Sequence, residues 1–571
     1  MSLDPVISEQ AEIVTKEKRA WKTERGRVMK RRARVLLRIL LVLVFVAVIA
    51  SVLIYTLLWN PRVDFVVNQT AFPLTTEQKL EDFEYLYRML EQNYPYFEVK
   101  KRQLGMDWLS KKQEFASMIA ETRSDAAFYH VLEDILMLLQ NGHTNIIKPG
   151  ANYEDYREIY GGHTPWSQIF NNSGVMEAYA YWETALEEHE KLMLPVAFKY
   201  IEGGYCAWSN PVDPEISPAN YGIPRGSRLV EVDGISTDDY IKTLMDRYIL
   251  DYDRLRGKAK VNALVIYTDR PVRLGVETPE GERRDITLEP ARPVQAESSD
   301  EDVPEHLFST LKDEEAGIAY LRLPSFSALY VEKDGPGIRA FLEEIRDYRG
   351  LVIDIRLNGG GSTAYWERNI VAPLIDKPLE MKCFALFRDS TYLKPFIKHK
   401  LFTDYLALKR IDSLNAGDHT PEYYFADGKG WITEITYRTE PDNPVGFRGK
   451  VYLLVDDYVF SASESFAAFA KATGWATLVG TDTGGDGIGY DPIPIVLPNS
   501  GLIVRFPGEM GLNPDGSVNE EVKTIPDVYV EQTWEDIQKR FRREDIGVTL
   551  RERLEYDTIL RKAFELAGAF P

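Results

Sequence analysis

The feature that most restricts the fold of this chain is a stretch of 21 residues without a charge, Ile39 to Trp59. A helix rises about 1.5 Å per residue, so a helix of this length spans the hydrocarbon layer of a bilayer. Basic residues crowd its N-terminal side, in KRRARVLLR at 30–38, and few charges follow it closely. This asymmetry predicts a single-pass helix with a cytoplasmic N-terminus and an extracytoplasmic body.

A cleaved signal peptide is the alternative interpretation of this stretch. The basic segment is too long for one, the apolar run exceeds the usual hydrophobic region, and no small-x-small cleavage site follows. We therefore predict an uncleaved anchor in the cell membrane. It consists of a basic cytoplasmic tail over 1–38, a transmembrane helix over 39–59 and a linker over 60–74.

The net charge is distributed unevenly along the chain. It is -20 in total, but residues 1–38 hold eleven Lys or Arg against five Asp or Glu, or +6, which leaves -26 for the remainder. A surface this acidic repels phosphate backbones, so we expect no nucleic acid partner for the main body.

The chain contains two cysteines, Cys206 and Cys383. They could form one disulfide outside the membrane or remain as two buried thiols, and the sequence does not choose between these states. Neither a CxxC pair nor an HExxH motif occurs, so a zinc site has no support.

Behind the linker the predicted secondary structure changes in kind. A capping threonine, Thr75, precedes apolar residues at helical spacing. Strand-like alternation follows, with a hairpin turn at Pro-Glu-Gly. From Ala316 onward strands and helices alternate, which indicates an α/β domain with sites at its strand ends. We expect a helical domain over 75–142, a connecting segment over 143–194, a β domain over 195–295, an α/β domain over 305–540 with an insertion at about 400–446, and a C-terminal helix over 541–571.

Ser461 lies in VFSASESF, where an apolar strand turns into an apolar helix. Backbone N–H groups at the start of a helix have no intrahelical partner, so an oxyanion docked there would be stabilised. A nucleophilic serine fits this place. The competing interpretation is a capping box, in which Ser461 and Glu464 only satisfy the helix end.

Two further elements carry candidate chemistry. The strand end DIRLNGGGS, at 354–362, lets backbone amides approach a ligand, and its spacing fits neither GxGxxG nor a P-loop. Two of the seven histidines, His143 and His163, lie in Gly-His-Thr loops. Periodicity alone does not choose which of these two is a base.

Together these stretches resemble the C-terminal processing (tail-specific) serine peptidase family, in particular its tricorn-core-like branch. The matching stretches fall in the family's order over about 76–530: LEQNYPYF, LEDILMLLQNGHTNI, GIPRGSRLVEVDGIS, LVIDIRLNGGGS, the serine segment and DGSVNEEVKTIPDVYV. The resemblance implies a ClpP/crotonase-like spiral α/β core with an N-terminal helical domain and an inserted PDZ-like domain at 195–295, behind the transmembrane helix.

The resemblance also implies site residues. Ser461 matches the nucleophile, and the amides of Ala462 and of Gly359 or Gly360 match the oxyanion hole. Many members carry a lysine base 25 residues after the serine, where this sequence has Asp486. A carboxylate with an ordinary pKa near 3.9 is a feeble base toward a hydroxyl.

The tricorn-like branch uses a histidine base instead, which matches His143 because a helix precedes it. An imidazole, with an ordinary pKa near 6.5, is available as a base at neutral pH without burial. The glutamate that orients the histidine in this branch falls on Glu520, with Glu521 as the adjacent alternative. Glu464 is assigned a capping role.

The resemblance therefore implies a membrane-anchored serine endopeptidase of Ser-His-Glu type that acts on extracytoplasmic proteins or peptides. No metal or organic cofactor is required. A polypeptide substrate would dock on the PDZ-like domain, either by its C-terminus or as an extended peptide beside a strand. The alternative is a catalytically inactive peptide-binding scaffold, and a related acyl-CoA enzyme is disfavoured because it needs neither a PDZ-like module nor an outward-facing position.

Overall fold

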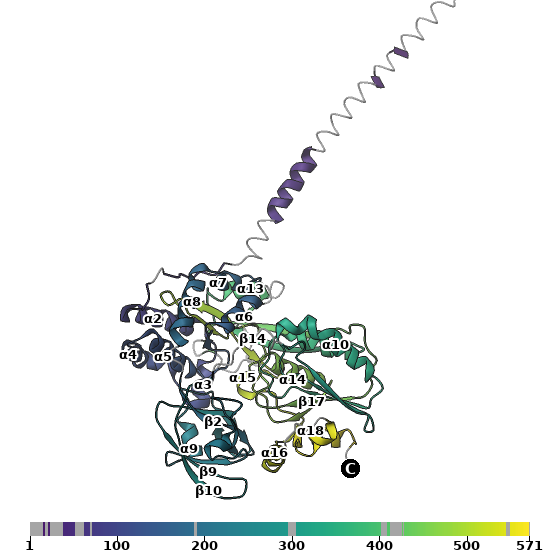
Figure 1. Ribbon diagram of the computed structural model, residues 1–571. Coiled ribbons are helices and arrows are strands. Elements are labelled where there is room, and N and C mark those ends of the chain that lie inside the picture. The colour runs from purple at the N-terminus through teal and green to yellow at the C-terminus, as the bar shows by residue number, and fades with distance from the viewer. Residues whose placement is uncertain are drawn as a thin grey trace, which may run out of the picture. The chain divides into compact units, whose positions relative to one another are not determined.

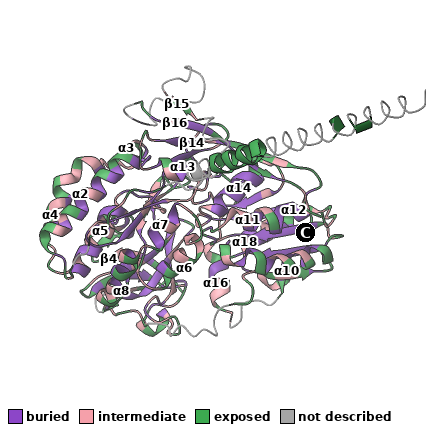
Figure 2. Ribbon diagram, turned by 90° about the horizontal axis from the view of Figure 1, so that it is seen from above, coloured by how far each residue is buried: buried purple, intermediate pink, exposed green. Residues whose placement is uncertain are grey.

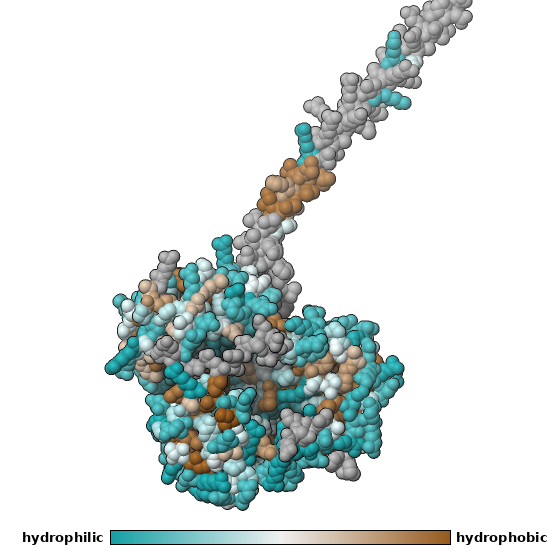
Figure 3. All heavy atoms as spheres, in the orientation of Figure 1, coloured by the Kyte–Doolittle hydropathy of each residue, from teal (hydrophilic) through white to brown (hydrophobic). Residues whose placement is uncertain are grey.

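The computed structural model describes residues 15–16, 21–22, 38–51, 62–68, 71–187, 191–294, 304–400, 408–411, 425, 428–543 and 549–569. The chain divides into two units, Met1–Arg62 and Val63–Pro571. In the first unit residues 38–51 form an exposed helix, whose apolar side chains stand out in Figure 3. Residues 52–61 lie outside the described residues, as does most of the predicted basic tail. No helix among the described residues is both long enough and apolar enough to cross a membrane.

The second unit begins with the predicted helical domain (Figure 1). A capping box between Thr75 and Gln78 starts its first helix, and the Ser124 side chain caps the last one. The connecting segment 143–194, for which no helices were predicted, also contains three helices. The helices of this part are α2 (Thr76–Asn93), α3 (Phe97–Leu104), α4 (Lys112–Ala120), α5 (Asp125–Met137), α6 (Ala151–Tyr160), α7 (Trp166–Phe170) and α8 (Ser173–Glu187), with a 3₁₀ turn η1 (Trp108–Lys111).

A β domain follows, with its own apolar core. Its main sheet has the strand order β10-β9-β4-β3-β2-β8, with β5 paired to β4, and every pair is antiparallel. The elements are β2 (Met193–Ile201), β3 (Gly204–Ser209), η2 (Pro218–Tyr221), β4 (Arg228–Val232), β5 (Ile235–Ser236), α9 (Thr237–Lys242), β6 (Asp251–Asp253), β7 (Lys258–Lys260), β8 (Ala263–Tyr267), β9 (Val272–Glu277) and β10 (Arg283–Leu288).

The sheet that positions the serine has the order β11-β12-β13-β17-β18-β22 and is parallel except for β11. Its central strands are buried along almost their whole length (Figure 2), as expected for a sheet covered on both faces. The elements are β11 (Ser309–Asp313), β12 (Ile318–Arg322), η4 (Ala328–Tyr330), α10 (Val331–Glu344), β13 (Gly350–Asp354), α11 (Thr363–Trp366), η5 (Glu367–Val371), α12 (Ala372–Leu374), β17 (Lys450–Val455), α14 (Ala462–Thr473), β18 (Thr477–Gly480) and β22 (Val528–Tyr529).

Alternate residues of these strands face two different apolar clusters. Leu351, Ile353 and Leu453 belong to the large cluster that includes α14, whereas Val352 and Leu454 belong to the cluster with the C-terminal helices. The sheet is therefore covered on both faces, and the predicted α/β class is confirmed.

A second, four-stranded sheet of order β15-β16-β14-β21 lies beside α14. It occupies part of the predicted insertion, of which residues 401–407, 412–424 and 426–427 lie outside the described residues. The remaining elements are β1 (Asn145–Ile146), β14 (Leu379–Phe387), α13 (Lys394–Lys400), β15 (Lys409–Arg410), β16 (Trp431–Thr439), β19 (Ile493–Val496), β20 (Ile503–Phe506), β21 (Glu509–Leu512), α15 (Asn519–Val522), α16 (Trp534–Phe541), α17 (Leu550–Leu554) and α18 (Thr558–Leu566). The predicted C-terminal helix over 541–571 is therefore two short helices, each started by its own cap at Thr549 or Asp557.

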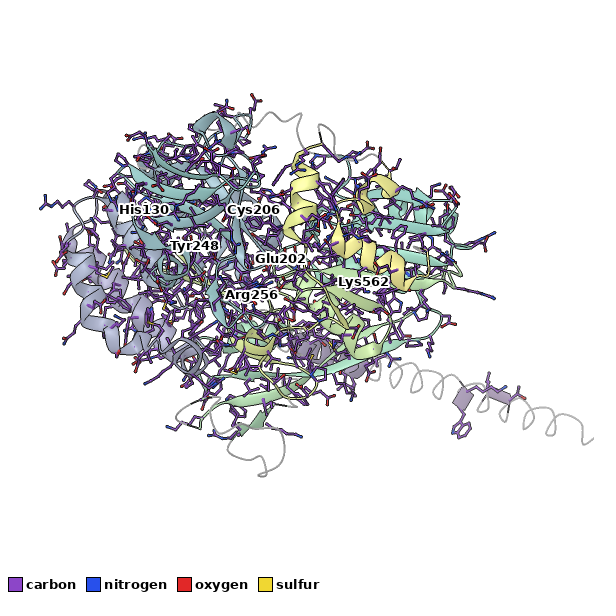
Figure 4. All side chains as sticks on the ribbon, turned by 90° about the horizontal axis from the view of Figure 1, so that it is seen from below. His130, Glu202, Cys206, Tyr248, Arg256 and Lys562 are labelled. Atoms are coloured by element: carbon purple, nitrogen blue, oxygen red, sulfur yellow. The ribbon has the colours of Figure 1, made fainter. Side chains whose placement is uncertain are left out.

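Side chains of the β6–β7 hairpin hold the β domain against the α/β domain. Arg256 pairs with Glu531 (Nη2 to Oε2, 2.8 Å), and its side chain is labelled in Figure 4. Cys206, also labelled there, is a buried free thiol in β3, and Cys383 is a buried free thiol in β14. Of the two states that the sequence left open, the structure shows unpaired cysteines.

Candidate active site

Ser461 lies in a sharp turn between β17 and α14. Its backbone has φ 57° and ψ -126°, a conformation that non-glycine residues rarely adopt and that costs free energy. The Ser461 side chain makes no capping hydrogen bond to the helix. The turn therefore presents the hydroxyl away from the helix end, and the capping-box interpretation is wrong.

His143 reaches this hydroxyl from the loop after α5. Its Nε2 lies 3.1 Å from Oγ of Ser461. The loop is fixed by Asn141, whose Oδ1 accepts from the His143 backbone N–H at 3.0 Å. The imidazole packs on the Phe460 ring, with 4.5 Å between the ring centroids. Gly142 is required beneath it, because a Cβ there would lie 2.7 Å from Cζ of Phe460. The structure thus brings together the two residues assigned as nucleophile and base.

The other imidazole nitrogen of His143 is bonded to Asp486. Nδ1 lies 2.8 Å from Oδ2, and Oδ2 also accepts from Nδ2 of Asn141 at 2.7 Å. The Tyr96 hydroxyl donates to Oδ1 at 3.1 Å. Burial alone would raise the pKa of Asp486, but the charge of His143, the hydrogen bonds from His143 and Asn141, and the charge of Lys100 together lower it. Asp486 is therefore a charged acceptor for the imidazole N–H.

The place that the sequence analysis gave to Glu520 is thus occupied by Asp486. Oε1 of Glu520 accepts from Nζ of Lys100 at 2.5 Å and from Nδ2 of Asn141 at 3.3 Å, and no hydrogen bond joins Glu520 to His143 in the described part of the chain. Burial raises the pKa of Glu520, a shift that Lys100 opposes and the charge of Asp486 reinforces. Asn141 lies between the carboxylates of Glu520 and Asp486 and donates to both, so Glu520 does not contact the imidazole directly.

The adjacent alternative, Glu521, points elsewhere. Its carboxylate pairs with Arg102 on α3. His163, the other histidine in a Gly-His-Thr loop, lines the same cavity as Ser461 but is exposed and forms no hydrogen bond to the serine among the described residues.

The glycine loop after β13 packs directly against the serine turn. A Cβ on Gly360 would lie 2.8 Å from Cβ of Ser461 and 2.9 Å from the amide nitrogen of Ala462, so only glycine fits there. The Gly360 N–H donates to Oδ1 of Asn358 at 2.9 Å, which removes it from the expected oxyanion donors. No hydrogen bond is formed by the N–H groups of Gly359 or Ala462 within the described residues. Of the expected oxyanion-hole donors, the amides of Gly359 and Ala462 therefore remain.

Glu464 has no capping role. It is fully buried, and its Oε1 accepts from Thr524 at 2.7 Å and from Asn519 at 2.8 Å. Oδ1 of Asn519 in turn accepts from the N–H of Gly487 at 2.9 Å. Glu464 therefore helps to fix the loop that carries Asp486.

A cavity of about 730 Å³ opens over the serine, with His143, Gly361, Ser461, Ala462 and Asp486 in its lining. Among the residues that the structure describes, no group of three or more His, Cys, Asp and Glu side chains could hold a metal ion. The site offers a hydroxyl, an imidazole and a buried carboxylate in line, next to two backbone amides that have no hydrogen bond in the described part of the chain.

Comparison with known families identifies the α/β domain. The family model of peptidase family S41 matches residues 317–530. The α/β domain of the chain belongs to peptidase family S41. It is accordingly a serine-type peptidase. The matched region contains Ser461, Asp486 and Glu520, whereas His143 lies upstream of it, in the loop that follows α5.

Solved structures share the fold of the chain. Mature CPAF complexed with lactacystin is 16% identical, with a TM-score of 0.56 over 86% of this chain and 99% of that chain. Mature CPAF is 16% identical, with a TM-score of 0.53 over 82% of this chain and 95% of that chain. No curated protein sequence matches the chain.

Proposed function

We propose that the chain hydrolyses peptide bonds of polypeptides with Ser461 as nucleophile, His143 as general base and Asp486 as the residue that orients the imidazole. The observation that carries this proposal is the continuous line from Oγ of Ser461 through both ring nitrogens of His143 to Oδ2 of Asp486, at 3.1 and 2.8 Å. A charged carboxylate at Nδ1 favours the tautomer in which Nε2 is free to accept the serine proton.

The reaction follows from this geometry. As Oγ of Ser461 bonds to the substrate carbonyl carbon, its proton passes to Nε2 of His143, and Asp486 stabilises the imidazolium. The N–H groups of Ala462 and of Gly359 are the candidate donors to the oxyanion. His143 then protonates the leaving amine, and a water molecule hydrolyses the acyl-enzyme with the same residue as base.

The conformation of Ser461 favours an active enzyme over a passive scaffold of the same fold. A residue at φ 57° persists only where the surrounding structure holds it there. Here the buried strand β17, the glycine loop and the first turn of α14 do so. A scaffold needs neither this strained turn nor an imidazole bonded on both sides.

The experiment for this proposal is active-site labelling with a fluorophosphonate probe, with lactacystin as a second reagent because mature CPAF was solved in complex with it. Trypsin is expected to release residues 451–471 as one peptide, which contains Ser461, Ser463 and Ser465. We expect the label on Ser461 alone, because Ser463 and Ser465 are fully buried. A folded protein that takes no label, or carries it on another serine, would favour the scaffold.

We further propose that residues 39–59 anchor the chain in the cell membrane with the peptidase outside, and that the β domain is PDZ-like and docks the substrate. The uncharged run and the basic residues before it support the anchor. The antiparallel sheet with the short helix α9, held against the α/β domain by Arg256, supports the docking role.

The anchor predicts how the full-length chain fractionates. After alkaline carbonate extraction we expect it in the membrane pellet, and protease added to intact cells should digest the body. Replacing Val44 and Val48 with lysine should release it, because each lysine at a helix centre costs about 3 kcal/mol of insertion free energy. Recovery of a soluble chain shortened at its N-terminus would show a cleaved signal peptide instead.

A further inference from the structure

One wall of the active-site cavity is formed by the edge of β16. Ile435, Thr436, Tyr437 and Arg438 all line the cavity. Side chains of a strand alternate between its two faces, and here Ile435 and Tyr437 are buried while Thr436 and Arg438 are exposed. Because side chains of consecutive residues point to opposite faces, all four residues can line one cavity only if the cavity runs along the main-chain edge of the strand. The strand therefore presents its main chain to the space above Ser461.

That edge of β16 is open over most of its length. On one side β16 pairs with β14 from Trp431 to Thr439, and on the other side β15 pairs only with Trp431 and Ile432. No strand among the described residues pairs with the outer edge over 433–439. An open edge offers a row of N–H and C=O groups to an extended peptide, which adds as a further strand.

The cavity lining carries more negative than positive charge. Glu158, Glu367, Asp486, Asp491 and Glu509 line it, with Arg438 and the two histidines as the basic groups. The Arg438 guanidinium is already paired with Glu380 at 3.0 Å and with Glu440 at 2.7 Å. The excess of carboxylates in the lining therefore favours a positively charged substrate side chain, and a negatively charged one does not find a free cation among the described lining residues.

Glu367 is the carboxylate best placed for such a contact. It is half-buried in the cavity wall at the first residue of η5, a π-helical turn that packs against β16. Single π-helical turns occur frequently at functional sites. No hydrogen bond or ion pair of Glu367 is found among the described residues, and the neighbouring Arg368 pairs with Glu332 at 3.2 Å.

The electrostatics of the wall agree with this placement. Burial raises the pKa of Glu367, and only Arg368 opposes the shift. Burial also raises the pKa of Tyr437 on β16, and the charge of Glu367 contributes to that shift. Glu367 thus lies close enough to β16 to act on a residue of the open edge, and it is a carboxylate that a cation would stabilise.

We infer that the S41 peptidase binds its substrate as an added strand along the outer edge of β16 and prefers a lysine or arginine side chain close to the scissile bond, held by Glu367. This inference rests on the proposed function, because a substrate at β16 is positioned for Ser461. The substrate class is therefore an extended, basic polypeptide segment.

The test is cleavage-site profiling with a peptide library made by digesting a proteome with an unrelated protease. Wild type is compared with Glu367→Gln, which removes the charge and keeps the shape, and with Ser461→Ala as the blank. Glu343→Gln is the matched control, because Glu343 is an exposed helical carboxylate paired with Arg339 and does not line the cavity. Cut positions are read by mass spectrometry.

We expect Lys or Arg to be enriched at one fixed position near the cut for wild type and Glu343→Gln, and this enrichment to be lost in Glu367→Gln. For a single peptide with lysine at that position, kcat/KM should fall about tenfold in Glu367→Gln, whereas its glutamine counterpart should change less than about twofold. Cleavage without a basic preference, or a preference that survives Glu367→Gln, overturns the inference and leaves the proposed function intact. A digest identical to the Ser461→Ala blank overturns both.

Discussion

Replacing Ser461 with alanine is expected to lower kcat by about 10⁶-fold, and replacing His143 with alanine to lower it by a similar factor. The two residues act as one unit, because the hydroxyl is nucleophilic only while Nε2 accepts its proton at 3.1 Å. The double variant should therefore be no slower than either single variant. Steady-state hydrolysis of a peptide that the wild type cleaves measures all three.

Thermal unfolding is the control for this double-mutant cycle. The Ser461 side chain makes no capping hydrogen bond, so Ser461→Ala should keep Tm within about 2 °C of the wild type. Additive losses in the two single variants would mean that the serine and histidine act independently. Full activity in His143→Ala would assign the base to another residue, with His163 in the same cavity as the first to test.

The second large effect is expected at Asp486. In Asp486→Asn the new amide can donate to Nδ1 of His143, which holds the imidazole in the tautomer whose Nε2 carries a proton and cannot accept one from Ser461. We expect kcat to fall by about 10⁴-fold with little change in KM. Hydrolysis at saturating substrate, measured from pH 5 to 9, tests this. The pKa of Asp486 lies below its ordinary value, so the wild-type carboxylate is charged throughout this range.

Glu520→Gln is the matched control for Asp486→Asn. A glutamine keeps an oxygen that accepts from Lys100 and Asn141, so we expect a loss of at most about tenfold to 100-fold, as for other groups that act through a neighbour. The comparison separates the two carboxylates. A larger loss in Glu520→Gln than in Asp486→Asn would return the orienting role to Glu520.

Ser461 and His143 could be predicted from the sequence because each lies in a short stretch with a recognisable local pattern. Ser461 lies at a strand-to-helix turn, and His143 follows a helix that ends on Asn-Gly. The resemblance to tail-specific peptidases then linked residues that are 318 positions apart. Pairing of this kind cannot be found from periodicity, since nothing local to either residue points to the other.

In the sequence, Asp486 stands where many members of the family carry a lysine base, and an aspartate is unsuited to act as that base. Its part as a partner of His143 depends on its left-handed backbone, with φ 52°, and on donors from Tyr96 and Asn141 far along the chain. The one local feature of the sequence that could have pointed to this role is that Asp486 is a charged residue between two glycines, in TGGDG. The family pattern points to Glu520, but in the structure Asn141 lies between Glu520 and Asp486, and it is Asp486 that contacts the imidazole.

The α/β alternation was predictable because strands buried on both faces read as apolar runs. The helices α6 to α8 were missed because their pattern is dominated by aromatic residues, which pack on one another rather than forming a simple apolar stripe. Tyr153 stacks on Tyr179 and Tyr156 on Tyr160, for example. The division of the predicted C-terminal helix depended on two local caps that the periodicity does not reveal.

The left-handed backbone of Ser461 also predicts which substitution would accumulate at this position once selection for activity is lost. Glycine adopts that conformation freely, whereas serine does so at a cost of about 1 kcal/mol or more. Once hydrolysis no longer benefits the cell, drift toward glycine at this position would make the fold more stable. His143, packed on Phe460, gains nothing comparable from being replaced. Homologues that have lost activity should therefore carry glycine at the position of Ser461 and still retain the histidine.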